Sequence, residues 1–353
     1  MKIEELEIKA LGLLKGLIKT PSFSGNEEDV SRIIQDLLKT FEIRYFTSGN
    51  NVWAQNQFFD TSKPTILLNS HMDTVKPNNG YTHDPFTPEI VSGKLFGLGS
   101  NDAGGPLVSL LSAFVYFYNR KNLKYNIVIA ATAEEESSGP NGLNSLLKEL
   151  PPIDFAIVGE PTGMQMAIAE KGLLVIDAYA PGKAGHAAHD NTENAIYNAL
   201  GDINHIRNYA FEKVSPLLGE VKMTVTQIEA GEQHNVVPAT CHFVIDVRVN
   251  EKYTSHEIFE VLDRQTKSKL LARSFHLNPS FIRKEHPFVQ AGLKWGRKTY
   301  GSPTLSDQSV LNIPSLKMGP GDSKRSHSAN EFIYLDELKE GIQLFIKIFE
   351  EIL

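Results

Sequence analysis

Short apolar runs alternate with amphipathic segments along residues 1–170. Four runs predict β-strands, the last three of them strongly apolar: Asn51–Asn56, Thr65–Ser70, Tyr125–Ala133 and Phe155–Val158. Helical spacing of apolar residues predicts helices at Ile3–Ile18, Glu27–Thr40, Gly105–Tyr118 and Gly142–Leu150. Because apolar strands between helices must be buried on both faces, this alternation predicts an α/β fold with a parallel or mixed sheet.

A different order of elements begins near Lys171. The expected order is βαββαβ, at Leu173–Ala180, Glu193–Phe211, Val221–Ile228, Cys241–Val249, Ser255–Ser268 and Ser274–Phe281. This is the ferredoxin-like order of a self-contained α+β unit. The α/β character then returns, and the chain ends in an amphipathic helix at Leu335–Leu353. We therefore expect an α/β domain of residues 1–170 and 282–353, interrupted by a smaller domain of residues 171–281.

Composition limits the class of protein. A chain of 353 residues suits about two domains with sizeable cores, and a formal net charge of −7 argues against nucleic acid or an anionic membrane as partner. Cys241 is the only cysteine, which suits a reducing compartment, so a cytoplasmic protein is expected. Residues 1–20 do not resemble a signal peptide, and no apolar run reaches the ~18–20 residues of a membrane helix.

Residue types that bind metals recur where the predicted strands end. His71 and Asp73 follow the second strand and lie on one face of an extended chain, where a carboxylate can orient a ligating imidazole. Taken alone, this pair is also typical of a polar strand end. The other candidates are Asp102 after a Gly-rich turn, the consecutive acids Glu134, Glu135 and Glu136, Glu160 after the fourth strand, and His327 in a Gly/Pro/Ser loop.

Open α/β sheets build their sites at the carboxyl ends of strands, so these side chains are expected to converge. Asp102 alone would be typical of a helix N-cap. Two histidines and several carboxylates, with no cysteine, suit two Zn²⁺ or Co²⁺ ions with nitrogen and oxygen ligands. Such ions would also offset the repulsion among the three consecutive glutamates.

The motifs HMDTV, NDAGG, GEPT, GHAAH and GPGD followed by His327, together with the acidic run, resemble those of the M20 family of zinc peptidases and deacylases. The resemblance spans nearly the whole chain and is strongest for the acetylornithine deacetylase group, especially short bacterial enzymes acting on N-acylornithine or N-acylcitrulline. It implies a metallopeptidase-like catalytic domain with a lid that dimerises. It also implies hydrolysis of N-acetylornithine in arginine biosynthesis by a homodimer with two Zn²⁺ or Co²⁺ per subunit.

The resemblance assigns the metal ligands residue by residue. His71 and Glu160 would bind the first metal, and His327 the second. Asp102 would bridge both metals, and Asp73 would orient His71. In one departure from the family, a glycine, residue 104, stands where a basic residue often follows the bridging aspartate.

The acidic run leaves two registers open. The family usually has Asp-Glu-Glu here, and in that register Glu135 is the general base and Glu136 a ligand of the second metal. In the alternative register Glu134 is the base and Glu135 the ligand. Adjacent residues of an extended chain face opposite ways, so one glutamate can face the metals while its neighbour faces the substrate.

The resemblance also implies substrate contacts. His186 matches a lid histidine that donates to the oxyanion in the partner subunit's site, although a solvated loop histidine is the alternative. Asn235 matches an asparagine that contacts substrate, and Arg248 an arginine that pairs with the substrate α-carboxylate, which suits bidentate recognition. The main-chain amides of Gly319 and Gly321 would help to hold that carboxylate.

The expected activity is therefore metal-dependent hydrolysis of a linear amide, with a small N-acyl amino acid as substrate. Other activities stay open: N-succinylornithine or N-acetylcitrulline deacylation, succinyl-diaminopimelate desuccinylation, and aminopeptidase or dipeptidase action. A member of a different class, a catalytically inactive protein that keeps the fold for binding, is disfavoured because every expected ligand and the base are present.

Overall fold

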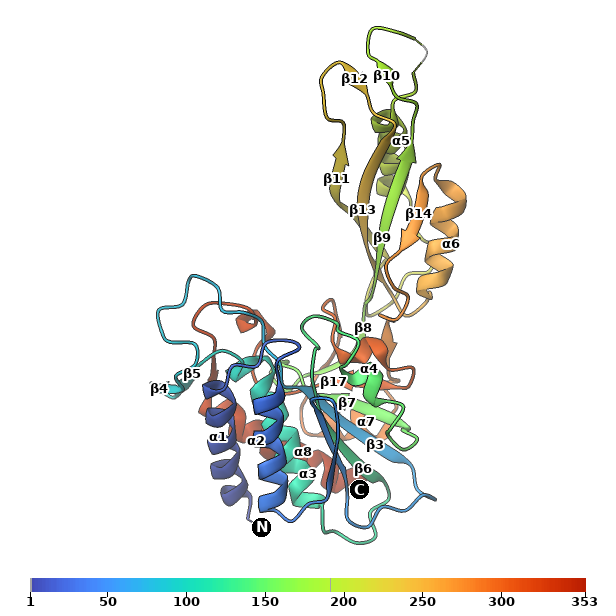
Figure 1. The fold of residues 1–353 in the computed structure, drawn as a ribbon. Coiled ribbons are helices and arrows are strands. Elements are labelled where there is room, and N and C mark those ends of the chain that lie inside the picture. The colour runs from blue at the N-terminus through green and yellow to red at the C-terminus, as the bar shows by residue number, and fades with distance from the viewer. Residues whose placement is uncertain (1, 191) are drawn as a thin grey trace. The chain divides into compact units, whose positions relative to one another are not determined.

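The computed structural model describes residues 2–190 and 192–353, which form two compact units. The first unit consists of Met1–Ile168, Phe281–Tyr300 and Ser306–Leu353, and the second of Ala169–Ser280 and Gly301–Leu305 (Figure 1). The second unit corresponds to the insertion expected at residues 171–281. It also includes residues 301–305, which the sequence pattern did not indicate.

A mixed sheet forms the centre of the first unit. Its strands run in the order β1-β2-β6-β3-β7-β17-β8, and β15 and β16 pair at the β8 side. β3 is parallel to both β6 and β7, whereas β2 is antiparallel to β6. The bounds are β1 Tyr45–Ser48, β2 Asn51–Gln55, β3 Thr65–His71, β6 Asn126–Thr132, β7 Phe155–Val158, β8 Met166–Glu170, β15 Ser280–Phe281, β16 Thr299–Ser302 and β17 Ser315–Lys317.

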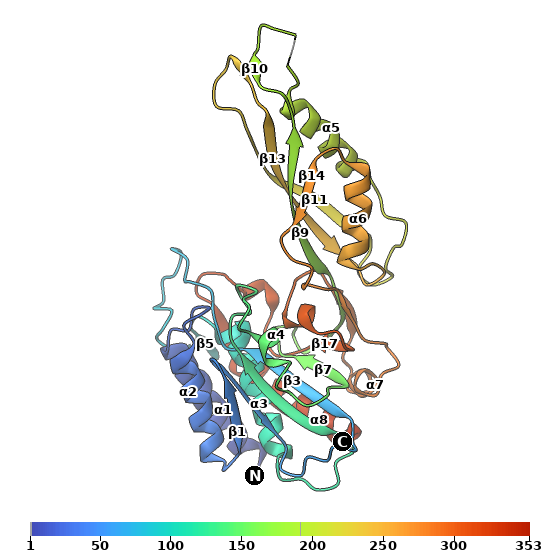
Figure 2. The same cartoon turned by 45° about the vertical axis from the view of Figure 1, so that its right-hand side comes forward.

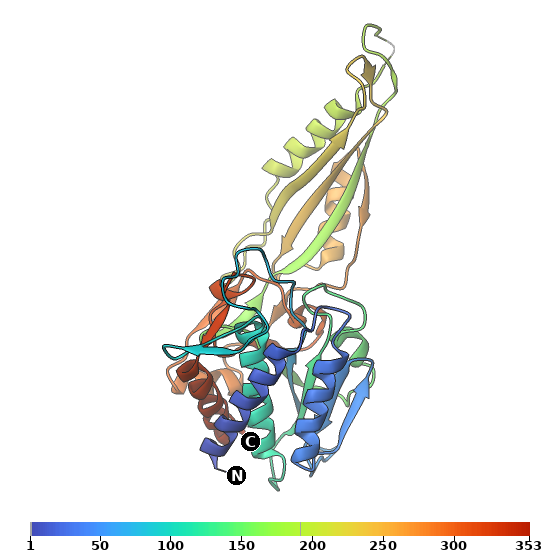
Figure 3. The ribbon, with the colours of Figure 1, turned by 60° about the vertical axis from the view of Figure 1, so that its left-hand side comes forward.

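Helices pack on one face of this sheet: α1 Ile3–Lys19, α2 Glu28–Thr40, α3 Gly105–Phe117, α7 Pro287–Lys294 and α8 Leu335–Ile352 (Figure 3). Ile66 and Leu68 of β3 point into the core that they form. Leu67, between them, belongs to a separate apolar cluster with α4 (Leu143–Leu146) on the other face. The sheet is therefore buried on both faces, which confirms the predicted α/β class.

The helix predicted at Gly142–Leu150 was too long, because α4 ends at Leu146. Pro151 and Pro152 follow, and a proline disfavours helical geometry in the residue before it. A small antiparallel sheet in the order β18-β5-β4 completes the unit. Its strands are β4 Glu89–Val91, β5 Lys94–Phe96 and β18 Phe332–Tyr334. Ser100–Gly104 forms a turn whose backbone is not helical at Asp102 and Ala103, and short 3-10 helices lie at Asp307–Val310 and Ser323–Arg325.

The second unit is a four-stranded antiparallel sheet with two helices on one face (Figure 2). The chain order is β9 Gly172–Pro181, α5 Ala195–Asn208, β11 Lys222–Ala230, β13 Thr240–Val249, α6 Ser255–Gln265 and β14 Lys269–Ala272. The spatial order β11-β13-β9-β14 is that of the predicted ferredoxin-like unit. A two-residue ladder between β10 (Gly185–His186) and β12 (Val236–Val237) lies outside this sheet.

The last strand of this unit was predicted at the wrong place, Ser274–Phe281, whereas β14 spans Lys269–Ala272. The Asp202 carboxylate accepts hydrogen bonds from the main-chain N–H groups of Lys267 and Ser268, which follow the end of α6 and lead into β14. Pro279 lies in the predicted run and cannot donate to a ladder. Among the described residues, no helix is both long and apolar enough to cross a membrane.

Candidate metal centre

His71, the last residue of β3, presents one ring nitrogen to a group of carboxylates. Its Nδ1 lies 2.9 Å from the main-chain oxygen of Asp73 and 3.4 Å from Asp73 Oδ1. Because both neighbours are acceptors, Nδ1 carries the hydrogen, and the Nε2 lone pair is left for a cation. Nε2 lies 3.3 Å from Asp102 Oδ1 and 3.9 Å from Glu160 Oε1.

Asp102 lies between the two histidines. Its Oδ1 faces His71, and its Oδ2 is 3.8 Å from His327 Nε2. The same nitrogen of His327 is 2.9 Å from Glu136 Oε2. His327 has a left-handed backbone, with φ 57°, which is uncommon for a residue other than glycine and recurs at functional sites.

The structure thus brings together the five predicted ligands within the first unit. Ligand atoms of His71, Asp102 and Glu136 all lie within 4.8 Å of one another. Glu160 and His327 adjoin this group through the contacts described above.

Charge in the group is unbalanced. Burial lowers the pKa of His71, but hydrogen bonds to neighbouring carboxylates outweigh this effect and hold the pKa well above its usual value. Glu136 raises the pKa of His327 to about 9. Burial raises the pKa of Glu135 well above its usual value, although the charge of His71 acts the other way. Without metal, the two histidines and Glu135 therefore hold protons more readily than free side chains do. Two imidazoles among carboxylates are also a donor set that fits divalent cations.

Buried carboxylates hold the backbone of the acidic run. The N–H of Glu134 donates to Glu27 Oε1 at 3.2 Å. The N–H groups of Glu135 and Glu136 donate to the two carboxylate oxygens of Asp73, each at 3.1 Å. Asp73 therefore fixes both the imidazole of the first histidine and the peptide units of the two following acids.

The three glutamate side chains diverge. Glu134, with φ 56°, turns back, and its carboxylate accepts from the main-chain and side-chain N–H groups of Asn141 at 3.0 and 2.8 Å. Glu135 Oε2 lies 3.9 Å from His71 Nε2, and Glu136 contacts His327. The Glu134 carboxylate thus forms hydrogen bonds within its own turn, while the side chains of Glu135 and Glu136 face the histidines.

Gly104 has no room for a side chain. A Cβ there would lie 2.4 Å from the main-chain oxygen of Gly99 and 2.7 Å from Leu14 Cδ1. The departure from the basic residue common in the family thus matches the close packing of this turn.

The predicted substrate residues are placed in both units. In the second unit, His186 pairs with Val236, and the Ala187 N–H donates to the Asn235 oxygen, so His186 and Asn235 are exposed neighbours. Arg248 donates through Nε and Nη2 to the Asp246 carboxylate at 2.9 and 3.0 Å.

In the first unit, the Gly319 N–H already donates to Thr162 Oγ1 at 3.1 Å. Gly321 has φ 95°, and a Cβ there would lie 2.5 Å from Asn101 Oδ1. The close approach of Asn101 therefore requires glycine at position 321, independently of any substrate.

Three buried acids near the centre escaped prediction. Glu27 holds the acidic run, as described above. Asp307 Oδ2 accepts from Thr132 Oγ1 at 2.8 Å, and burial raises the pKa of Asp307 to about 6. Burial also raises the pKa of Glu331 to about 8. Asp307 and Glu331 contact residues far away in the chain, so no local pattern marks them; only the position of Glu331 shortly after His327 gave a hint.

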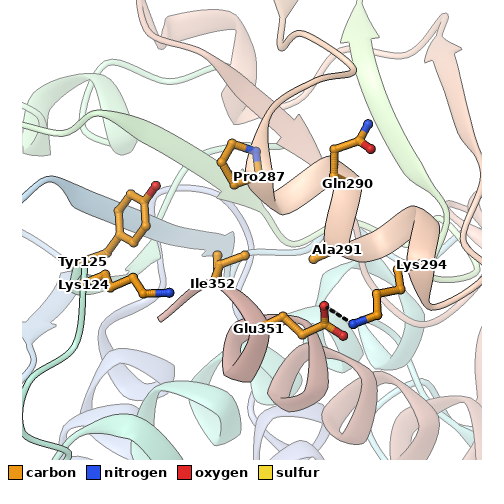
Figure 4. A pocket seen from close by; sticks show the side chains of 8 residues that line it. All are labelled: Lys124, Tyr125, Pro287, Gln290, Ala291, Lys294, Glu351 and Ile352. Carbon is orange, nitrogen blue, oxygen red and sulfur yellow. Dashed lines mark hydrogen bonds and ion pairs between the residues drawn. The ribbon is translucent and has the colours of Figure 1, made fainter.

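A pocket of about 570 Å³ lies at the opposite end of β6 (Figure 4). Lys124 and Tyr125, which line it, directly precede β6, whereas the acidic run follows that strand. Seven residues of strand span ~23 Å, so this pocket is separate from the candidate centre. Its one lining carboxylate, Glu351, is paired with Lys294 at 2.9 Å, and its lining residues therefore do not resemble a metal site.

Comparisons with known proteins indicate the family and the fold of the chain. The model of peptidase family M20/M25/M40 matches residues 67–351. A succinyl-diaminopimelate desuccinylase of Psychromonas ingrahamii is 26% identical, with 97% of this chain and 98% of that protein covered. A putative [LysW]-lysine/[LysW]-ornithine hydrolase of Pyrobaculum aerophilum is also 26% identical, with 93% of each covered. Among solved structures, a dinuclear metal-binding peptidase of the M20 family from Bacillus subtilis has a TM-score of 0.74 at 16% identity, with 98% of each chain covered.

Proposed function

The chain belongs to peptidase family M20/M25/M40, and from this premise we propose that it is a metal-dependent amidohydrolase that releases an amino acid from its N-acyl form. The observation that carries the proposal is Asp102, whose two carboxylate oxygens face two histidines from distant parts of the chain. A carboxylate in this position suits a bridge between two cations ~3.5–4 Å apart.

The proposed ligands divide into two sets. His71 and Glu160 hold one ion, His327 and Glu136 hold the other, and Asp102 serves both. Zn²⁺ or Co²⁺ suits this set of nitrogen and oxygen donors. When bound, such ions polarise the amide carbonyl and lower the pKa of water.

Glu135 is the proposed general base. It lies beside His71 but is not needed as a ligand. Burial raises the pKa of its carboxyl group, which therefore accepts and holds a proton more readily. It would take a proton from the attacking water at a carboxylate oxygen and pass it to the leaving amine. Asp73 supports this step by holding the Glu135 N–H and orienting His71.

The proposed substrate is an N-acylated diamino acid. The names of the two sequence relatives include diaminopimelate, lysine and ornithine, and N-acetylornithine has the same kind of amine. The first two candidates are N-succinyl-diaminopimelate, which the first of these names contains, and N-acetylornithine, which was expected from the sequence motifs. The similarity to peptidase structures is below 25% identity and concerns the fold.

We also propose that two copies pair through their second units. β11 is an edge strand whose outer side has no partner among the described strands, which makes it a template for pairing. Tyr197 and Leu200, three residues apart on α5, are 72% and 51% exposed, and Ile228 of β11 is 54% exposed. Apolar side chains gathered at an open edge suit a two-fold contact between copies of this chain.

Such pairing would give His186 and Asn235 a role. Both are exposed neighbours on the second unit, whereas all five proposed ligands lie on the first. We propose that they reach the site of the other subunit, where His186 donates to the developing oxyanion. Arg248 would bind the substrate α-carboxylate in exchange for Asp246, with the Gly321 amide as a further donor.

An assay of the Zn²⁺- or Co²⁺-loaded protein tests the proposed activity. The substrates are N-acetylornithine, N-succinylornithine, N-acetylcitrulline, N-succinyl-diaminopimelate and unmodified dipeptides, and the released amine is measured by chromatography. We expect hydrolysis of N-acyl amino acids, fastest for an N-acylated diamino acid. Faster turnover of the dipeptides would show a peptidase instead.

A further inference from the structure

Glu331 is a buried acid that has no role in the proposed metal centre. It is 1% exposed and lies four residues after His327, just before β18. Its Oε1 accepts hydrogen bonds from two successive main-chain N–H groups, those of Asn101 at 2.8 Å and Asp102 at 2.9 Å. Both N–H groups converge on one carboxyl oxygen, so Glu331 ties the peptide units of the turn to the segment that precedes β18.

The side chain of Asn101 makes a second tie to the same C-terminal segment. Its Oδ1 accepts from the Asp322 N–H at 2.9 Å, and its Nδ2 donates to the Asp322 oxygen at 3.1 Å. Asp322 precedes His327 in the chain and Glu331 follows it. The turn that carries Asp102 is therefore bound to the loop of His327 on both sides of the histidine.

These ties fix the distance on which the second ion would depend. Asp102 Oδ2 and His327 Nε2 lie 3.8 Å apart on different segments, so their separation depends on how the backbones of the two segments are held together. His71 is the last residue of β3, and Glu160 follows β7, so the central sheet holds both independently of this loop. A change at residue 331 would thus act mainly on the second position.

We propose that Glu331 is a positioning residue that sets the affinity of the second metal position by locking the Asp102 turn to the His327 loop. The inference rests on the dinuclear centre proposed above. Residues that orient metal ligands through hydrogen bonds typically change metal affinity by about 10–100-fold when mutated.

The experiment measures the stepwise binding of Zn²⁺ or Co²⁺ to the metal-free protein by equilibrium dialysis. In Glu331→Ala the two N–H groups lose their acceptor, and we expect the weaker binding step to fall by at least about tenfold while the tighter step changes less. Glu331→Gln keeps a carbonyl oxygen at the same place, so its affinities should stay closer to those of the wild type than to those of Glu331→Ala.

Asn330 supplies a matched control in the same segment. Its Oδ1 accepts from the N–H groups of Thr82 and His83 at 2.8 and 3.0 Å, and its Nδ2 donates to Thr82 Oγ1 at 2.8 Å. These bonds hold residues 82 and 83 rather than the Asp102 turn. Asn330→Gly removes these bonds and tolerates the left-handed backbone, φ 55°, so both binding steps should stay at wild-type affinity.

Unchanged binding in Glu331→Ala, equal loss of both steps, or equal loss in Asn330→Gly would overturn the inference. If Glu331→Ala does not fold, Glu331→Asp decides, because its shorter side chain keeps a carboxyl group but withdraws the acceptor oxygen from the two N–H groups. A weaker second step then supports the role, and wild-type affinity refutes it. Two ions bound by the wild type with no effect of any variant would refute this inference alone. A wild type that binds no ion would refute the proposed centre itself.

Discussion

His327 Nε2 lies 2.9 Å from Glu136 Oε2, although 191 residues separate the two in the chain. One residue comes from a loop before β18, and the other from the turn after β6. The contact supports our proposal that Glu136, rather than Glu135, would share a cation with His327. It leaves Glu135 free to act as the base in our proposal.

Substitution within the acidic run tests that division. Glu136→Gln should weaken the second ion by about tenfold or more, because an amide is a poorer ligand than a carboxylate. Glu134→Gln is the matched control, since Glu134 bonds to Asn141 and should leave metal binding unchanged. Metal content after dialysis measures both. Loss of metal in a Glu135→Gln variant, but not in Glu136→Gln, would favour the other register.

Glu135→Gln should keep both ions and lose most activity. Removal of a general acid/base lowers kcat by about 10²–10⁴-fold, and the amide cannot accept the proton from water. Steady-state kinetics on the metal-replete variant, with metal content measured on the same sample, checks this. A kcat near that of the wild type would assign the base elsewhere.

If His186 of each subunit acts in the site of the other subunit, two inactive variants should complement each other. Inactive His186→Ala and inactive Glu135→Gln subunits are mixed under conditions that allow exchange. In each mixed dimer one site carries both defects and the other neither, so activity should return to about a quarter of the wild-type value per chain, because half of the dimers are mixed. If no activity returns despite exchange, or if the active protein is a monomer, His186 does not act across a dimer.

His286 predicts a pH dependence of stability in the first unit. Its Nδ1 accepts from the Phe288 N–H at the start of α7, and burial lowers the pKa of the imidazole. Since the folded pKa lies below the unfolded value of ~6.5, the unfolded chain binds the proton first. The stabilisation is therefore complete above about pH 6.5 and is lost as the pH falls through the folded pKa.

His286→Asn separates this effect from other titrations, because asparagine caps a helix without ionising. The difference in free energy of unfolding between wild type and variant should fall by up to about 1 kcal/mol between pH 7.5 and pH 5. Urea unfolding of both metal-replete proteins at each pH measures it. A difference that does not change with pH would show that His286 does not titrate as described.

The position of the centre could be predicted because it depends on local pattern. His71 ends one apolar strand, and Glu136 and Glu160 follow two others. The carboxyl ends of parallel strands meet at one edge of the sheet. The register of the acidic run could not be decided in this way, because alternation along a strand gives neighbours opposite faces in either register. The left-handed residue Glu134 ends that alternation, and no residue type in the run signals it.

Long-range partners account for the remaining errors. The last strand of the second unit was misplaced because Asp202, 65 residues before Lys267, holds the turn into it. Glu331 was missed because its two donors lie 229 and 230 residues away. A single sequence shows that residue 331 is an acid, but it does not show which main-chain N–H groups donate to that acid.

Hydrolysis as a function of bound metal tests the central claim most directly. The metal-free protein is titrated with Zn²⁺, and the amine released from an N-acylated diamino acid is followed together with the ions bound per chain. The account predicts no turnover without metal, activity that rises until two ions are bound, and the same dependence with Co²⁺. Full turnover by the metal-free protein, or two bound ions with no hydrolysis of any N-acyl amino acid tested, would contradict it.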